Sequence, residues 1–134
     1  MSNDKLPIKR VVIAGCRGYN NYDEAKVYID FCISNIRKDN TIIIVSGCAS
    51  GADAIGERYA KDNGFKVEKY SADWKTYGRS AGPRRNKQMA EISDYIICFW
   101  DGKSKGIKSM IDYARKYGKP VKIKMICSSK KGCL

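Results

Sequence analysis

The sequence predicts a doubly wound α/β domain with a mostly parallel five-stranded sheet and helices on both of its faces. Three continuous apolar runs, at 10–15, 41–47 and 95–100, have the composition of strands buried on both faces. Segments with apolar side chains at intervals of three and four alternate with these runs, as helices do. The length of 134 residues suits one core. We therefore expect a single domain over 1–134, with its ordered core at about 10–126 and a flexible C-terminal tail.

Two weaker strands, at 65–70 and 120–126, complete the sheet. The helices between the strands are expected at 22–37, 51–63, 83–92 and 104–117. Asn21 is placed as the N-cap of the first helix, with Glu24 three residues on, and Gly118 ends the last helix. The order of elements is that of a parallel sheet with helical connections.

One segment has no regular pattern. Residues 71–82, "SADWKTYGRSAG", are polar and rich in glycine, and we expect a surface loop that carries function, followed by a helix with Pro83 in its first turn. Trp74 and Tyr77 lie in this segment close to Arg79. They either stack on a base or anchor the loop onto the core, and the sequence leaves both interpretations open.

The chain is strongly basic, with 26 Lys and Arg against 14 Asp and Glu, a formal net charge of +12. A positive field of this size favours polyanions or phosphorylated small molecules, and a solvated lysine-rich surface would account for it equally well. No apolar run approaches the roughly 18 residues that cross a bilayer, so no membrane partner is expected. The first residues show no secretory signal, which predicts a cytoplasmic protein.

Metal and cofactor chemistry finds little support in the composition. The six cysteines are spread singly along the chain: Cys16, Cys32, Cys48, Cys98, Cys127 and Cys133. Without histidine or a C-x-x-C pair, we expect no metal site and no required cofactor. Cys32 and Cys98 fall in apolar patterns and are expected in the core, whereas a thiol at Cys16 or Cys48, in a glycine-rich turn, would be more reactive.

Small residues follow three of the predicted strands, at 15–18, 46–47 and 101–102. Parallel strands end at one edge of a sheet, where open α/β sheets bind their ligands. Glycine lets backbone N–H groups approach an anion, and a helix that begins there adds a partial positive charge. Arg17 is well placed to hold a phosphate with two hydrogen bonds. These features predict a phosphate site at this edge.

Each feature also has a purely structural interpretation. Ser50 and Asp53 match a capping box, so Asp53 either caps the helix, or binds a ribose hydroxyl, or positions a water molecule. Gly47 and Gly51 would also suit a tight turn between strand and helix. The chain contains neither G-x-G-x-x-G nor G-x-x-x-x-G-K-[ST], which excludes the ordinary dinucleotide and nucleoside-triphosphate motifs.

Four stretches resemble a known family in order and spacing: "VVIAGCRGY", "VSGCASGADAIGERYA", "ADWKTYGRSAGPRRNKQM" and "FWDGKSKGIKSMIDYARKYGKPV". They are similar to the YspA-like branch of the SLOG superfamily, and the similarity covers about residues 10–123. The superfamily includes the LOG phosphoribohydrolases, the DNA-processing protein DprA and sensing domains for NAD-derived signalling nucleotides. The resemblance implies a Rossmann-like fold with a nucleotide-type ligand over 15–17, 46–53, 85–86 and 101–106.

The resemblance to LOG enzymes is incomplete at the residues that cleave the N-glycosidic bond. "RNKQM" retains the arginine as Arg85 and the methionine as Met89. In "WDGKSKGIKSM", Ile107 stands where LOG enzymes have threonine, and Met110 where they have the catalytic glutamate. Methionine cannot transfer a proton, so catalysis of the LOG type is not expected unless Asp53, Asp73 or Asp101 substitutes.

The candidate catalytic residues are thus Arg85, Asp53 and Asp101. The candidate ligand-binding residues are Gly15, Cys16, Arg17, Tyr19, Ser46, Gly47, Ser50, Gly51, Ala52, Asp53, Arg79, Gly82, Pro83, Arg85, Asn86, Asp101, Gly102, Ser104 and Gly106. The favoured function is binding of a phosphorylated nucleotide or nucleotide-derived signal, as a sensor or a sponge. The alternatives are cleavage of a nucleotide N-glycoside and DprA-like binding of single-stranded DNA. The resemblance also implies a homodimer or larger homo-oligomer.

Overall fold

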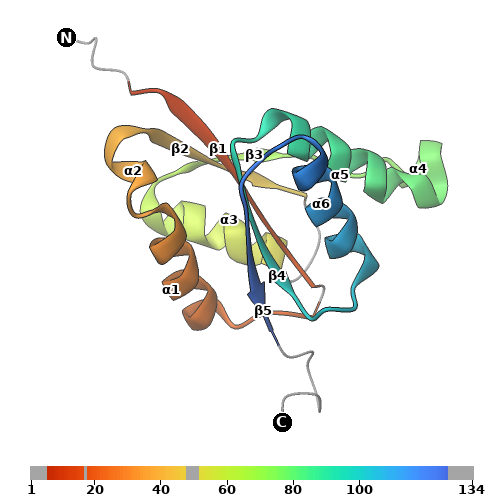
Figure 1. The fold of residues 1–134 in the computed structure, drawn as a ribbon, viewed down its shortest axis with the longest axis horizontal. Helices are drawn as coiled ribbons and strands as arrows, with labels where there is room; N and C mark the ends of the chain where they lie inside the picture. Colours follow the sequence, from red (N-terminus) through yellow and green to blue (C-terminus); the bar gives the residue numbers. More distant parts are fainter. Residues whose placement is uncertain (1–5, 17, 48–51, 127–134) are drawn as a thin grey trace.

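The computed structural model describes residues 6–16, 18–47 and 52–126 and confirms the Rossmann-like α/β fold. Five strands form one parallel sheet in the order β3-β2-β1-β4-β5 (Figure 1). The strands are β1 (Ile8–Gly15), β2 (Thr41–Ser46), β3 (Lys66–Lys69), β4 (Tyr95–Trp100) and β5 (Val121–Met125). The helices are α1 (Tyr22–Ile33), α2 (Ile36–Asp39), α3 (Ala52–Asn63), α4 (Trp74–Tyr77), the 3-10 turn η2 (Gly78–Ser80), α5 (Ala81–Ile92) and α6 (Lys105–Lys116).

The helices form two layers around the sheet. α1, α2 and α3 pack on one face against a core that includes Val11 and Ile13, and α5 and α6 pack on the other face against Val12 and Ala14 (Figure 1). Neighbouring residues of β1 thus serve opposite cores, which is why the central strands read as unbroken apolar runs. β1 and β4 are paired neighbours, and the strand order changes direction between them: β2 and β3 follow on the β1 side, and β5 follows on the β4 side.

The predicted first helix, 22–37, is divided into α1 and α2. The N-cap is confirmed, because the Asn21 side chain accepts a hydrogen bond of 3.1 Å from the Glu24 N–H. At the division, the Ser34 hydroxyl donates to the Phe31 carbonyl at 3.3 Å and competes with the helical ladder. Ser34 and Asn35 nevertheless keep right-handed helical angles, so the path of the chain continues into α2.

The prediction of a surface loop over 71–82 is confirmed for the surface position of 71–80 and for the irregular structure of 71–73, but irregular structure is wrong for 74–82. The chain forms α4 and η2 there, and α5 begins at Ala81, two residues before Pro83. Asp73 caps α4 by accepting the Thr76 N–H at 3.1 Å, and Gly78 ends it with a φ of +54°. Local capping therefore ordered a segment whose composition suggested a loop.

Of the cysteines that the structure describes, Cys98 is fully buried, as predicted. Cys32 is partly buried and packs against the core on the α1 side. Across the described residues, no helix combines the length and the apolar character needed to cross a membrane.

Candidate functional site

The candidate site lies at the edge of the sheet where the strands end. The register pairs Gly15 of β1 with Phe99 of β4, and Ser46 of β2 with Lys69 of β3. The ends of these four strands are therefore neighbours along one edge. Two groups of predicted site residues gather there, one after β1 and β4, and one between β2 and α5.

The first group surrounds the turn after β4. One Asp101 oxygen, Oδ1, accepts the N–H groups of Lys103 and Ser104, both at 2.8 Å. Gly102 has a φ of +83°, a conformation that favours glycine. The Ser104 hydroxyl then caps α6 by accepting the Ile107 N–H at 3.5 Å. Asp101 thus accepts, within the protein, hydrogen bonds from N–H groups that the sequence analysis expected to bind an anion.

The environment of this turn shifts two pKa values in opposite directions. The backbone N–H groups of Lys103 and Ser104 lower the pKa of Asp101, so its carboxylate is ionised near neutral pH and is a weak general acid. Burial raises the pKa of Cys16, whose side chain lies near Asp101. A neutral thiol is a poor nucleophile, so the structure does not support the reactivity expected of Cys16.

The second group joins β2 to α5. Arg85 donates from Nη1 to the Gly47 carbonyl at 2.6 Å and from Nε to the Asn86 side chain at 3.1 Å. Asn86 is buried and donates to the Gly106 carbonyl at 3.2 Å, which connects this group to the start of α6. Ser46 is fully buried, and its hydroxyl donates to Glu57 of α3 at 2.6 Å.

A cavity of about 220 Å³ opens beside this second group. It lies between the end of β3, α4 and α5, and its lining residues are Ser71, Asp73, Tyr77, Ala81, Arg84, Arg85 and Gln88. The Arg84 guanidinium stacks over the Tyr77 ring at 4.2 Å from the centroid. Two cations and an aromatic ring on one cavity suit an anionic ligand that also has a flat ring.

Several of these lining residues were not predicted from the sequence. Ser71, Ala81, Arg84 and Gln88 were not among the candidates. Ser71 and Ala81 lie in the segment that was expected to be irregular, whereas Arg84 and Gln88 lie in the helix predicted at 83–92 and were not singled out. The signal was present in the spacing, since Tyr77, Ala81, Arg84 and Gln88 follow intervals of four, three and four. A helical interpretation would have placed them on one face.

The remaining candidates are dispersed around these groups. Tyr19 is buried, stacks on Phe99 at 5.1 Å between centroids, and donates its hydroxyl to Glu24 at 2.6 Å, which is a core position. Arg79 is exposed in η2, and Pro83 is exposed in the first turn of α5. Gly82 is buried beneath Trp74, whose Cη2 lies 3.3 Å from the position that a Cβ would occupy.

Trp74 itself is 57% exposed, so its ring leans on α5 at Gly82 and is not buried in the core. Among the predicted residues, Arg17, Ser50 and Gly51 lie outside the described residues, and so does Cys48. Ala52 and Asp53 begin α3, and their side chains are likewise outside the described part. The proposed roles of Arg17 and Asp53 therefore stay predictions.

The two positions that differ from LOG enzymes face the core. Met110 is 1% exposed and Ile107 is 8% exposed, and both belong to the cluster between the sheet and α6. Met110 is thus part of the core and does not line the cavity described above. Within 6–16, 18–47 and 52–126, no group of three or more Cys, Asp or Glu side chains is arranged to hold a metal ion.

The comparisons with known proteins agree with one another. The model of the YspA, cpYpsA-related SLOG family matches residues 9–77. The chain is 33% identical over 120 residues to the Gene 61 protein of Mycobacterium phage D29, in an alignment that covers 85% of this chain and 94% of that relative.

Among solved structures, two DNA-processing proteins A have the same fold. The DprA structure from Streptococcus pneumoniae gives a TM-score of 0.65 at 19% identity, over 88% of this chain and 50% of that one. The DprA structure from Helicobacter pylori, a protein described by its binding of single-stranded DNA, gives a TM-score of 0.65 at 20% identity. The match covers 94% of this chain and 69% of that one. The chain thus spans half the length of the first of these proteins. At these identities the likeness is one of fold.

Proposed function

Because the chain belongs to the YspA, cpYpsA-related SLOG family, we propose that it binds a phosphorylated nucleotide or a nucleotide-derived signal at the C-terminal edge of its sheet. The observation that carries the proposal is the cavity lined by Arg84, Arg85 and Tyr77. In this assignment the protein senses or sequesters its ligand.

The cavity suggests how such a ligand would lie. Its volume of about 220 Å³ is below the roughly 300 to 1,000 Å³ of sites that enclose a whole drug-sized molecule. It would hold a phosphate and part of a sugar, with the base outside against the Tyr77 ring. Arg84 is exposed, stacks on Tyr77 and donates from Nε to the Ser80 hydroxyl at 3.2 Å, so turning toward a phosphate would break two side-chain contacts and no backbone contact. Arg85 has its Nη1 on Gly47 and would instead hold the wall of the cavity in place.

Binding without cleavage is supported by the surroundings of the two candidate acids whose side chains the structure describes, Asp73 and Asp101. Asp101 is ionised and bonded to backbone N–H groups, and Met110 is buried. Asp73 lines the cavity but caps α4. None of these side chains is poised to protonate a leaving base.

Thermal denaturation with AMP, ADP-ribose and NAD tests the proposal. A ligand at about 100 times its Kd adds about 2.7 kcal/mol of stability and raises the Tm. We expect Arg84→Gln to weaken binding about tenfold, in the range of one lost charge-assisted contact. Arg115→Gln is the matched control, because Arg115 is an exposed arginine at the far end of α6.

The proposal fails if no nucleotide raises the Tm, or if Arg84→Gln binds them as the unaltered chain does. Chromatography of the same mixtures detects any free base. Release of base that is lost in Arg85→Ala would replace binding by N-glycoside cleavage as the function.

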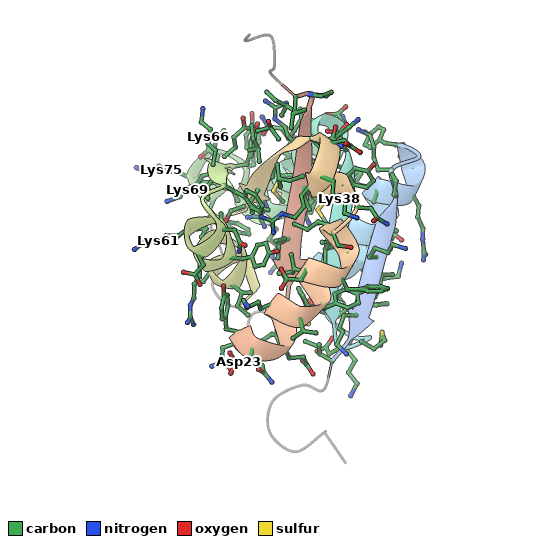
Figure 2. The ribbon with its side chains drawn as sticks, turned by 90° about the vertical axis from the view of Figure 1, so that its left-hand side faces the viewer. Asp23, Lys38, Lys61, Lys66, Lys69 and Lys75 are labelled. Carbon is green, nitrogen blue, oxygen red and sulfur yellow. The ribbon has the colours of Figure 1, made fainter. Side chains whose placement is uncertain are left out.

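A second candidate function, binding of single-stranded nucleic acid, is favoured by one edge of the molecule. Lys61 of α3, Lys66 and Lys69 of β3, and Lys75 of α4 are exposed and project along the same side (Figure 2). Only Lys69 of these four has a described ion pair, a loose one of 3.9 Å to Glu57. Cations in a row along an edge strand would follow a phosphate backbone.

Fluorescence anisotropy with a labelled oligo-dT at several salt concentrations separates this function from the first. Each phosphate contact contributes about 0.7 to the slope of log K against log salt for single strands. Lys66→Gln with Lys75→Gln should lower the slope by about 1.4. Lys116→Gln with Lys122→Gln removes the same charge from α6 and β5 and should leave the slope unchanged. Equal effects of the two pairs would show that only net charge matters.

A further inference from the structure

The outer face of α1 exposes two large apolar side chains. Val27 is 70% and Phe31 is 75% exposed, more than any other large hydrophobic side chain among the described residues. They lie four residues apart and are therefore neighbours on one face of the helix. The opposite face of α1 is already buried against the sheet through Ala25, Ile29 and Ile33. Val27 and Phe31 thus have no role in the core of this chain.

A charge stands at each end of this apolar pair. Asp23 lies one turn before Val27, and Lys38 of α2 lies about two turns after Phe31. Ser34 and Asn35 keep right-handed helical angles, so the spacing of 23, 27, 31 and 38 continues one stripe along α1 and α2. Figure 2 shows Asp23 and Lys38 at opposite ends of the segment formed by α1 and α2. We call these four residues the α1 stripe.

The α1 stripe is complementary to itself. We propose that it is the surface through which two copies of this chain pair, with their α1 helices antiparallel about a two-fold axis. Val27 of each copy then packs on Phe31 of the other. Lys38 of each copy lies about 4.5 Å along the helix beyond the point opposite Asp23 of the other, a distance that its long side chain can span. A two-fold interface needs a patch that matches its own reversed image, and an acidic end, an apolar centre and a basic end meet that condition.

A second copy explains the stripe better than a nucleotide or a nucleic acid does. The stripe lies on the α1 face of the sheet, whereas the cavity lies between β3, α4 and α5. Pairing therefore leaves the cavity open, and the proposal is independent of the proposed function. One helical face buries less than the roughly 800 Å² per partner of a standard interface, so the expected dimer is weak, with a micromolar Kd.

Sedimentation velocity of the full chain, from low micromolar to several hundred micromolar, tests the pairing. We expect a reversible monomer–dimer equilibrium. Phe31→Ser should weaken it about tenfold or more. Met125→Ser is the matched control, since Met125 is 59% exposed on β5, outside the stripe, and should leave the equilibrium unchanged.

Charge exchange gives the sharper result. Asp23→Lys and Lys38→Asp should each weaken the dimer, because each places like charges opposite one another. The double variant Asp23→Lys with Lys38→Asp should restore it, which no loss of folding could imitate. A chain that is monomeric throughout, or a dimer that is unaffected by Phe31→Ser and by the single charge changes, would overturn the proposal. Circular dichroism of each variant verifies that the compared proteins are folded.

Discussion

Asp101 shows how a residue at a binding edge can serve the fold first. Its Oδ1 holds the N–H groups of Lys103 and Ser104, which would otherwise be free to bind an anion. The sequence placed Asp101 among the candidate ligand-binding and catalytic residues, and its bonds in the structure are to its own turn. A carboxylate that accepts two backbone N–H groups is stabilised in its charged form, which is the cause of its lowered pKa.

The pKa of Asp101 predicts a dependence of stability on pH. A carboxyl group whose folded pKa is lowered stabilises the fold above its unfolded pKa, and this contribution is lost as the pH falls through the folded pKa. At about pH 7, we expect Asp101→Asn to cost about 1 kcal/mol of unfolding free energy, the difference between charged and neutral acceptors.

Once the pH is below the lowered pKa of Asp101, the two proteins should differ little, because the charge is then lost from the unaltered chain as well. Urea denaturation of both proteins at several pH values measures the difference between their free energies of unfolding. A difference that stays constant on acidification would contradict the stabilising role of the ionised Asp101 carboxylate.

At the scale of elements, α3 approaches the sheet unusually closely at Gly56. A Cβ built at Gly56 would lie 3.0 Å from Ile13 Cβ of β1 and 3.6 Å from Ile44 Cγ2 of β2. The first of these atoms is attached directly to the backbone of a buried strand, so a change of rotamer cannot remove it. The glycine is therefore a packing requirement of the interface between α3 and the sheet.

Gly56→Ala is expected to destabilise the fold by about 1 to 2 kcal/mol, since overpacking exceeds the roughly 1 kcal/mol that alanine gains over glycine in a helix. Gly106→Ala is the control with the opposite expected sign, because nothing lies within 4 Å of a Cβ there. Gly106 is also helical, so the same substitution should stabilise α6 by several tenths of a kcal/mol. Chemical denaturation measures both, and a stabilised Gly56→Ala would show that α3 moves freely on the sheet.

At the scale of the whole molecule, the three proposed contacts fall on three surfaces. The C-terminal edge holds the cavity, the β3 edge carries exposed lysines, and the α1 face presents the α1 stripe (Figures 1 and 2). The α1 stripe is separate from the cavity because the strand order reverses between β1 and β4, which sends α1 to α3 to one face of the sheet and α5 and α6 to the other. The cavity and the lysine edge adjoin each other at the end of β3 and at α4. The excess of positive charge is thus compatible with both proposed anions, a nucleotide at the cavity and a single-stranded nucleic acid along the lysines of the β3 edge.

The sequence by itself determined the class of fold and the positions of the strands and most helices. Apolar runs, the Asn21 cap and the Gly118 terminus depend on interactions within a few residues, which a single sequence displays. The same local reasoning failed at 71–82, because a polar composition concealed the helical spacing from Tyr77 to Gln88.

Only the tertiary structure decided which side chains meet at the site. Arg85 reaches Gly47 across 38 positions, and Asn86 reaches Gly106 across 20. These contacts depend on the strand order and on the face that each helix covers, which are set by burial summed over the whole core. No local pattern encodes these long-range contacts, so the cavity between β3, α4 and α5 became visible only once the chain was folded.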